Sequence, residues 1–432
     1  MNFAPLWAAA TTLASPVLRI MLRIRVRRGK EILERLAERR GVETTPRPRG
    51  RLVWLHAASV GETVSVLPVL ASLAEQSPST TLLLTTGTVT SARLLALRLP
   101  EFRLEQRVIH RFAPLDVPAW AARFVDHWRP DVVGFVESEL WPNLVRACRV
   151  RSIPLMLINA RLSPRSFARW RRVPAAASAV LSGFTRIEAQ SCADAERLRV
   201  LGACSVSVPG NLKFASSTLP VDEAELRRLR DEIGTRPVWL AASTHPGEEP
   251  LIFAAHRMLA ATHPRLLTIV APRHPERGAA VLAVAGATSA TRRGAGEGPP
   301  PGEGVWIVDT LGELGLLYRL AGTAFVGRSL VLPGGGQNPL EGARLGCAIA
   351  VGQHTANFSE IVGVLGTEGA LVRVNDVSGL TDWVARMIGQ PAVRDAIGRA
   401  GVRAAARYAD LPDRTATTLL SLMTRSTRPD SG

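Results

Sequence analysis

Short apolar runs alternate with stretches of helical spacing along most of this chain. The clearest case is the run Leu52–Leu55, which is short enough to be a buried strand. Small residues and Gly61 follow it, and apolar residues then recur at helical spacing from Val64 to Leu73. A strand, a tight turn and a helix in this order form the first half of a βαβ unit. In open α/β sheets of such units, ligands bind just outside the strand ends.

The same alternation continues to about residue 209. Near-continuous apolar strands separated by helices, such as the one predicted over 118–128, indicate a parallel sheet covered on both faces. The further strands predicted for this half cover residues 80–86, 107–112, 131–136, 153–158, 187–190 and 205–208.

A charged helix over residues 219–234 leads into a second series of the same kind. Residues 291–304 are rich in Gly and Pro, which predicts a mobile surface insertion. We expect an α/β protein with two Rossmann-like domains facing a cleft. The strands predicted for the second half cover residues 238–242, 266–270, 305–308, 323–326 and 347–351. The expected division is an anchor and basic helix over 1–40, a first domain over 41–209, a linker over 210–236, and a second domain with C-terminal helices over 237–432.

The N-terminus is apolar from Phe3 to Leu18, and to Leu22 if Arg19 is included. Twenty helical residues span about 30 Å, the thickness of a bilayer core. Five basic residues follow between positions 23 and 30, on the wrong side for a cleaved signal peptide and on the side expected for a cytoplasmic body. This pattern fits a marginal membrane span, an amphipathic helix lying in the interface, or an N-terminal core helix.

The net charge narrows the class of partner. The 432 residues carry 53 Lys and Arg against 37 Asp and Glu, a formal charge of +16. Nucleic acid, an anionic membrane and an anionic substrate would each suit this charge. Aromatic residues are few and the sequence has no helix-turn-helix, RNP or zinc-finger pattern, so we expect no nucleic-acid partner.

The sequence also has no Walker, GxSxG or HExxH motif and no Asp-X-Asp pair, so we expect no metal and no cofactor.

Acidic and basic residues follow the predicted strand ends of the first half. Glu62 lies at a helix N-terminus, where the helix dipole favours the ionised carboxylate that a proton acceptor needs. A plain helix cap is the alternative interpretation. Glu137 and Glu139 follow another strand, and Lys213 lies where this half meets the linker. Lys213 suits a leaving phosphate, although a solvated surface lysine is the alternative.

Three turns of the second half are of a kind that binds phosphate. They are residues 271–274, 309–313 and 334–338, each between a strand and a helix. Backbone N–H groups at helix N-termini favour anions, and Arg273 adds a charged donor. Turns at successive strand ends of one sheet converge on one cleft. Glu341 beside them suits a ribose diol, because carboxylates accept hydroxyl hydrogen bonds.

Eight short motifs in order along the chain resemble those of the Kdo transferases, the lipid A-modifying 3-deoxy-manno-octulosonate transferases of Gram-negative bacteria. The resemblance extends from the N-terminal anchor to about Phe358. The motifs are HAASVGE (56–62), ESELWPN (137–143), INARLS (158–163), GNLKF (210–214), ASTHPGEE (242–249), APRHPER (271–277), DTLGEL (309–314) and GQNPLEGA (336–343).

This resemblance implies a GT-B fold and transfer of Kdo from CMP-Kdo to the lipid A precursor lipid IVA. The reaction would be inverting and metal-independent, on the cytoplasmic side of the cell inner membrane. By resemblance Glu62 is the proton acceptor, and Glu137 and Lys213 stabilise the transition state. Where many relatives have Gly-Gly-His-Asn, this chain has Gln337 before Asn338, and an extra residue nearby. The residues that match CMP contacts are Pro272, Arg273, Leu311, Gly312, Glu313, Asn338, Pro339, Leu340 and Glu341.

Two other functions remain open at this point. One is a membrane-associated GT-B enzyme that uses a UDP-sugar, which competition by CMP against UDP would distinguish. The other is a non-catalytic protein that binds anionic lipid, which a turnover assay would distinguish.

Overall fold

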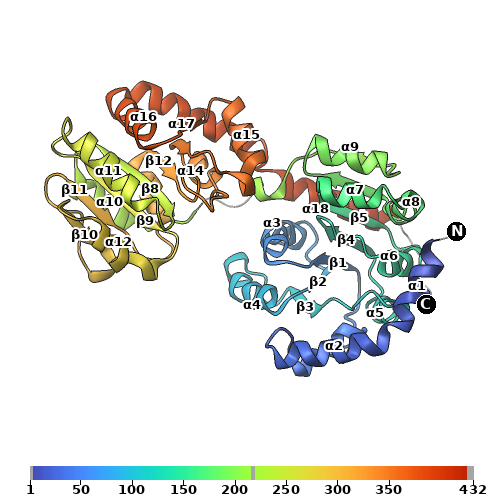
Figure 1. Ribbon diagram of the computed structural model, residues 1–432. Helices are drawn as coiled ribbons and strands as arrows, with labels where there is room; N and C mark the ends of the chain where they lie inside the picture. Colours follow the sequence, from blue (N-terminus) through green and yellow to red (C-terminus); the bar gives the residue numbers. More distant parts are fainter. Residues whose placement is uncertain (1–2, 216–218, 426–432) are drawn as a thin grey trace. The chain divides into compact units, whose positions relative to one another are not determined.

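The chain forms two compact units, each built on a parallel sheet (Figure 1). The structure is a computed structural model that describes residues 3–215 and 219–425. The first unit contains the described residues up to 215 together with those from 408 onward, and the second contains those from 219 to 407. The predicted α/β class with two Rossmann-like domains is confirmed.

The sheet of the first unit has seven parallel strands in the order β3-β2-β1-β4-β5-β6-β7. The order reverses at β1, which pairs with β2 on one side and β4 on the other. Such a reversal opens a crevice at the carboxyl ends of the two central strands. The strands are β1 (Leu52–Ala57), β2 (Thr81–Thr86), β3 (Val108–Phe112), β4 (Val132–Val136), β5 (Leu155–Ala160), β6 (Arg186–Ala189) and β7 (Val206–Ser207).

Helices cover both faces of this sheet because successive strand residues point to opposite faces. Trp54 packs with Phe124 and Phe135 on one face, whereas Val53 belongs to the core on the other face. The helices are α3 (Val60–Gln76), α4 (Val89–Arg98), α5 (Pro118–Trp128), α6 (Pro142–Arg149), α7 (Pro164–Trp170), α8 (Pro174–Leu181), α9 (Cys192–Val200) and α18 (Leu411–Arg425).

The last helix, α18, belongs to a different unit from the one expected. It was expected to complete the second domain, but it packs against α3 and β4 of the first unit. Its apolar residues Leu411, Ala416 and Leu419 are buried in the core on that face of the first sheet. The chain therefore returns to its first unit, because burying this apolar stripe there removes it from water.

The sheet of the second unit has the order β10-β11-β9-β8-β12-β13-β14 and is also parallel throughout. Its order reverses at β8, as that of the first sheet does at β1. The edge strands β10 and β14 were not predicted, because three residues are too few to show a period. The strands are β8 (Val238–Thr244), β9 (Leu267–Pro272), β10 (Ala290–Arg292), β11 (Gly304–Ile307), β12 (Thr323–Val326), β13 (Ala348–Val351) and β14 (Leu371–Arg373).

Two segments of the second unit take a different place from the one expected. The helix predicted within the linker packs against the body of this unit. The Gly/Pro-rich segment 291–304, expected to be a mobile insertion, pairs through β10 with β11. The helices are α10 (Glu223–Ile233), α11 (Glu249–Ala260), α12 (Gly278–Val284), α13 (Leu314–Ala321), α14 (Leu340–Arg344), α15 (Ser359–Thr367), α16 (Val377–Gly389) and α17 (Pro391–Ala406).

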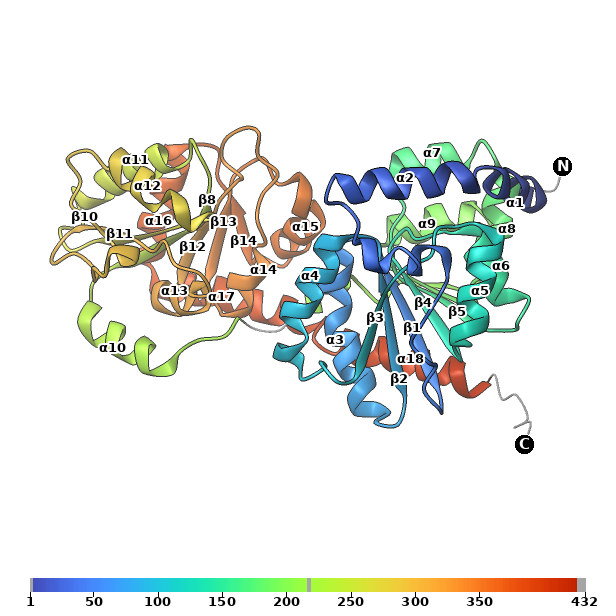
Figure 2. The ribbon, with the colours of Figure 1, turned by 90° about the horizontal axis from the view of Figure 1, so that it is seen from below.

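The apolar N-terminus forms two helices, α1 (Phe3–Leu13) and α2 (Ser15–Arg27), which lie along the first unit (Figure 2). α1 contacts α5, α6 and α8. Within the described residues, no single helix has the length and apolar character to cross a bilayer. The two N-terminal helices meet those criteria only together, as a pair bent by 55°.

Candidate active site

The carboxylate of Glu62 is held at the start of α3 by two local donors. The backbone N–H of Ala58 donates to Oε2 at 2.8 Å, and the hydroxyl of Ser59 donates to Oε1 at 2.7 Å. Ser59 Oγ in turn accepts from the N–H of Glu62 at 3.3 Å, so Ser59 is the N-cap of α3. Each carboxylate oxygen can accept two hydrogen bonds, so both retain capacity for a further donor. Glu62 is therefore a helix cap that can still accept a proton.

The surroundings of Glu62 shift the pKa of its carboxyl group upward. The residue is only 8% exposed, and this burial raises the pKa of its carboxyl group. The bonds from Ser59 and Ala58 lower that pKa, whereas the negative charges of Glu139 and Glu137 raise it further. A raised pKa brings a carboxylate closer to the range in which proton transfer is efficient.

Glu137 and Lys213, which the sequence placed in one site, form an ion pair. Lys213 Nζ lies 2.6 Å from Glu137 Oε1. The backbone of Glu137 has a φ of 57°, a left-handed conformation that is uncommon for glutamate. Such conformations are held by their surroundings and concentrate at functional sites.

Lys213 is positioned by the residues on both sides of it. The N–H of Leu212 donates to Asn159 Oδ1 at 3.0 Å, at the end of β5. The N–H of Lys213 donates to Asn211 Oδ1 at 3.0 Å. Phe214 packs edge-on against Tyr408 at 5.0 Å between ring centroids. The INARLS and GNLKF motifs thus meet in the structure, and together they direct the lysine to Glu137.

Glu139 has a different set of partners, which sequence reasoning missed. Its Oε2 lies 3.3 Å from His56 Nε2, and it also accepts a hydrogen bond from the indole N–H of Trp141. Burial opposes ionisation of Glu139, but the bond and charge of His56 and the bond from Trp141 hold its pKa below the usual value. His56 Nδ1 lies 2.9 Å from Thr85 Oγ1. The signal available in the sequence was a buried histidine at the end of β1.

In the second unit, the structure brings Arg273, Asn338 and Glu341 together. Asn338 Nδ2 donates to Glu341 Oε1 at 3.3 Å. Burial raises the pKa of Glu341, while the Asn338 bond and the positive charges of Arg273 and Arg344 lower it. Pro272 ends β9, and the N–H of Arg273 donates to Thr244 O at 3.0 Å. This cluster offers a cation, an amide and a carboxylate at the strand ends.

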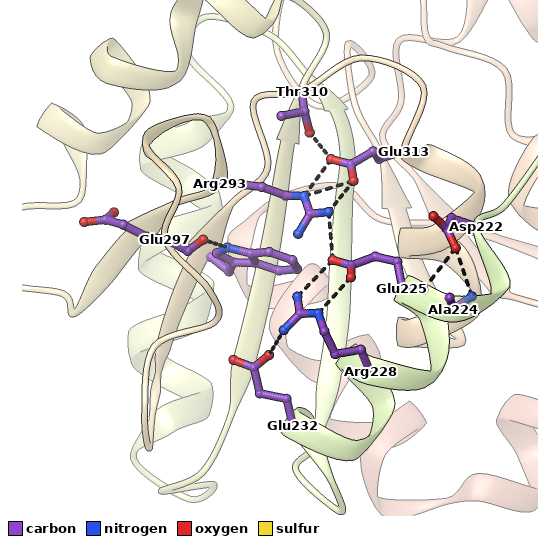
Figure 3. Close-up of polar contacts among 10 residues, drawn as sticks. Asp222, Ala224, Glu225, Arg228, Glu232, Arg293, Glu297, Thr310 and Glu313 are labelled. Carbon is purple, nitrogen blue, oxygen red and sulfur yellow. Dashed lines mark hydrogen bonds and ion pairs between the residues drawn. The ribbon is translucent and has the colours of Figure 1, made fainter.

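The turn Leu311–Glu313 leads from β11 into α13, with Gly312 at a φ of 82°. The side chain of Leu311 is 80% exposed. The carboxylate of Glu313 is already bound by Arg293 and by the hydroxyl of Thr310 (Figure 3). A ligand at this turn would therefore meet backbone N–H groups and not a free carboxylate.

The glycine-rich turn before Asn338 packs against the segment around His354. Gly335 N–H donates to His354 O, and Asn357 N–H donates to Gly335 O, both at 2.9 Å. A Cβ on Gly334 would lie 2.2 Å from the Cβ of His354, so this contact requires glycine. His354 is a histidine that only the fold places beside the turn. Pro339 precedes α14, and Leu340 begins it.

Comparison with known proteins links these motifs to one family. A family profile described as 3-deoxy-D-manno-octulosonic-acid transferase (kdotransferase) matches residues 34–216. A probable mitochondrial 3-deoxy-D-manno-octulosonic acid transferase of Arabidopsis thaliana is 36% identical over 367 residues, 83% of this chain and 81% of that protein. The corresponding transferase of Haemophilus influenzae is 35% identical over 381 residues, 85% of this chain and 86% of that protein.

Solved structures resemble the chain in fold. A UDP-GlcNAc 2-epimerase from Neisseria meningitidis matches with a TM-score of 0.58 and 13% identity, over 86% of this chain and 100% of that one. A glycosyltransferase from Rickettsia africae matches with a TM-score of 0.56 and 11% identity, over 88% of this chain and 100% of that one. These likenesses confirm the GT-B fold.

Proposed function

The chain belongs to the 3-deoxy-D-manno-octulosonic acid (Kdo) transferase family of glycosyltransferases, and from this membership we propose that it transfers Kdo from CMP-Kdo to lipid IVA. The reaction would release CMP and contribute to lipopolysaccharide biosynthesis. The observation that supports this most directly is Glu62, a buried carboxylate with spare acceptor capacity near the Glu137–Lys213 ion pair.

In the proposed reaction, Glu62 takes the proton from the 6′-hydroxyl of the lipid A disaccharide. The hydroxyl oxygen forms a bond to the anomeric carbon of Kdo while the bond from that carbon to the phosphate oxygen breaks, with inversion. CMP leaves with the bonding electrons. Glycosyl transfer of this kind passes through an oxocarbenium-like transition state.

The remaining site residues have separate roles in this proposal. The positive charge of Lys213 stabilises negative charge that develops on the leaving phosphate. The carboxylate of Glu137 holds Lys213 and supports positive charge on the sugar. In the second unit, Arg273, the turn Leu311–Glu313 and residues Asn338–Glu341 bind CMP, with the buried Glu341 carboxylate suited to ribose hydroxyls.

The test is release of CMP from CMP-Kdo with a tetra-acylated lipid A precursor, measured with and without acceptor and without added metal. Wild type is compared with Glu62→Ala and with Glu75→Ala. Glu75 is an exposed glutamate on the same helix and serves as the matched control. We expect acceptor-dependent release that Glu62→Ala lowers by at least about 100-fold and Glu75→Ala leaves unchanged.

The outcomes separate the parts of the proposal. Full activity of Glu62→Ala would overturn the role of Glu62 as base but not the transfer reaction. Inhibition by UDP in preference to CMP would overturn the choice of donor. Absence of CMP release by folded wild type would overturn the transfer reaction and favour a UDP-sugar enzyme or a lipid-binding protein.

We also propose that α2 lies in the cytoplasmic interface of the inner membrane. An apolar stripe of exposed residues, Val17, Ile20 and Ile24, follows one side of the helix at helical spacing, while Leu22 is buried against the protein. An amphipathic helix with arginines beside such a stripe binds anionic lipid. The exposed basic residues on and just after this helix are Arg19, Arg23, Arg27, Arg28 and Lys30.

Flotation with vesicles tests this membrane proposal. Wild type should float with vesicles containing anionic phosphatidylglycerol more than with neutral phosphatidylcholine vesicles. Ile20→Glu should abolish flotation. Leu97→Glu is the matched control, because Leu97 is 74% exposed on α4 and lies outside the stripe. Flotation of Ile20→Glu equal to wild type would contradict the proposal.

A further inference from the structure

The segment Arg292-Arg293-Gly294 holds the turn 309–313 at both of its ends. At one end, the N–H of Gly294 donates to Asp309 Oδ1 at 2.7 Å, and Arg292 Nε lies 2.8 Å from Asp309 Oδ2. At the other end, Arg293 binds the carboxylate of Glu313. The turn that the family resemblance assigns to CMP is therefore clamped by a neighbouring segment.

Arg293 binds Glu313 through two of its nitrogen atoms. Its Nε donates to the two carboxylate oxygens at 2.9 and 2.7 Å, and one terminal nitrogen donates to Oε1 at 2.5 Å (Figure 3). The Glu313 carboxylate also accepts from the hydroxyl of Thr310. A fork of this kind fixes both the position and the orientation of a carboxylate.

The guanidinium itself is fixed on two further sides. Arg293 stacks over the ring of Trp306 in β11, with 5.3 Å from its central carbon to the ring centroid. Trp306 is fully buried, and its indole N–H donates to Glu297 O at 3.1 Å. Arg293 also donates to Glu225 of α10 at 3.0 Å. Arginine is suited to such a place because it can stack and form a bidentate ion pair at once.

Close packing prevents the Asp309 end of the turn from shifting. A Cβ on Gly278 would lie 1.9 Å from Asp309 Oδ2, and a Cβ on Gly294 would lie 2.6 Å from Asp309 Oδ1. The side chain of Asp309 therefore fills the space that two glycines leave. The backbone from Asp309 to Glu313 is held in one arrangement by contacts at both ends.

The charge of Glu313 explains why this clamp matters for a nucleotide. Glu313 directly precedes α13, where exposed backbone N–H groups would otherwise favour an anion. A free carboxylate there would repel the phosphate of a nucleotide, because like charges close to each other raise the free energy of binding. Pairing with Arg293 cancels that repulsion and keeps the carboxylate turned toward β10 and α10.

We propose that Arg293 is a positioning residue for the donor nucleotide. It neutralises and restrains Glu313, so that the turn 309–313 can accept the anionic group of CMP. This role rests on the proposed function, since it takes the CMP-binding turn from the family resemblance. Arg293 itself makes no contact with the nucleotide in this scheme.

The test measures CMP binding by calorimetry in the full-length protein. We expect Arg293→Gln to weaken CMP binding about tenfold, because Glu313 is left unpaired beside the phosphate. In the double variant Arg293→Gln/Glu313→Gln the repulsion is absent, so the affinity should return to within about twofold of wild type. Arg293→Lys, which keeps the charge without the fork, should lie between the two.

Arg228→Gln is the matched control. Arg228 belongs to the same network and binds Glu225 and Glu232, but it has no bond to Glu313 (Figure 3). We expect unchanged CMP affinity in this variant. In turnover assays, Arg293→Gln should raise KM for CMP-Kdo and leave kcat nearly unchanged, whereas general loss of structure would lower both the active fraction and kcat.

Each outcome decides the proposal. Weakened binding in Arg293→Gln with recovery in the double variant supports it. Weakened binding without recovery overturns it, because Arg293 would then contact CMP itself or hold the fold. Unchanged binding in Arg293→Gln also overturns it. Absence of CMP binding by wild type would overturn the proposed function and this inference together.

Discussion

Two glutamates occupy equivalent places in the two units and are used in different ways. Glu62 and Glu248 each follow the strand at which the sheet order reverses, β1 or β8, and each comes directly after a glycine at a helix N-terminus. The preceding residues are also similar, VWLHAAS over 53–59 and VWLAAS over 238–243. Local sequence therefore gives little reason to assign them different roles.

Their hydrogen-bond partners differ. Glu248 accepts four backbone N–H groups, from His245 at 3.0 Å, Arg328 at 2.6 Å, Ser329 at 2.9 Å and Leu330 at 3.0 Å. The residue is fully buried. Glu248 thus uses its whole acceptor capacity to hold the loop after β12, while Glu62 has two donors and room for a third. The comparison indicates that one carboxylate stabilises the fold and the other can react.

Replacing Glu248 with Gln should have the largest effect on stability. The amide nitrogen of Gln would face backbone donors that have no other acceptor, so we expect a loss of about 3 kcal/mol in the local opening free energy of the β8–α11 region. Glu62→Gln should cost no more than about 1 kcal/mol around α3, because one oxygen still accepts. Hydrogen exchange of peptides from the two regions measures both. Equal losses of opening free energy in the two regions would contradict the distinction between Glu248 and Glu62.

Removing the positive charge of Lys213 should lower the turnover number of the enzyme. We expect Lys213→Met to reduce kcat by about 100-fold, because no cation would then stabilise the negative charge that develops on the leaving phosphate. Lys213→Arg keeps the charge and should retain activity within about tenfold. CMP release with saturating CMP-Kdo is the measurement. A kcat near that of wild type in Lys213→Met would contradict the proposed role.

The pH dependence tests whether neighbouring carboxylates tune Glu62. Burial and the charge of Glu139 raise the pKa of Glu62, and activity is lost as falling pH protonates this base. Glu139→Gln removes one negative neighbour, so the pKa of Glu62 should fall and the acid limb of the kcat/KM profile should move to lower pH. Glu75→Gln should leave the limb in place. Movement of the limb to higher pH in Glu139→Gln would contradict this coupling.

A smaller effect on local stability is expected from Trp7→Phe, where α1 contacts the rest of the first unit. The indole N–H of Trp7 donates to Asp116 Oδ2 at 2.9 Å, and Asp116 also accepts from the N–H groups of Asn143 and Leu144. Trp7→Phe removes one donor and leaves the others, so we expect α1 to open more easily by about 1 kcal/mol. Hydrogen exchange in α1 measures this, with Thr12→Ala as the control for a bond internal to the helix. Unchanged exchange in Trp7→Phe would show that the bond does not hold α1.

Much of the fold could be predicted from the sequence, because buried parallel strands are continuous apolar runs. The helix predicted over 118–128 and the strand predicted over 323–326 coincide with α5 and β12. The same reasoning could not assign α18 to the first unit, since the partner of an amphipathic helix is set by contacts far apart in sequence. It also missed β10 and β14, whose three residues show no period.

The sequence by itself determined the family, the strand–turn–helix frame and the residue types available at each strand end. The motifs are local, and local spacing is enough to record them. Tertiary structure decided which charged groups meet: Glu137 with Lys213, Glu139 with His56, and Glu313 with Arg293. It also decided that Glu248 is saturated by backbone donors and that Glu62 is not. These pairings join residues up to 83 positions apart, and only the folded sheet brings their partners within hydrogen-bond distance.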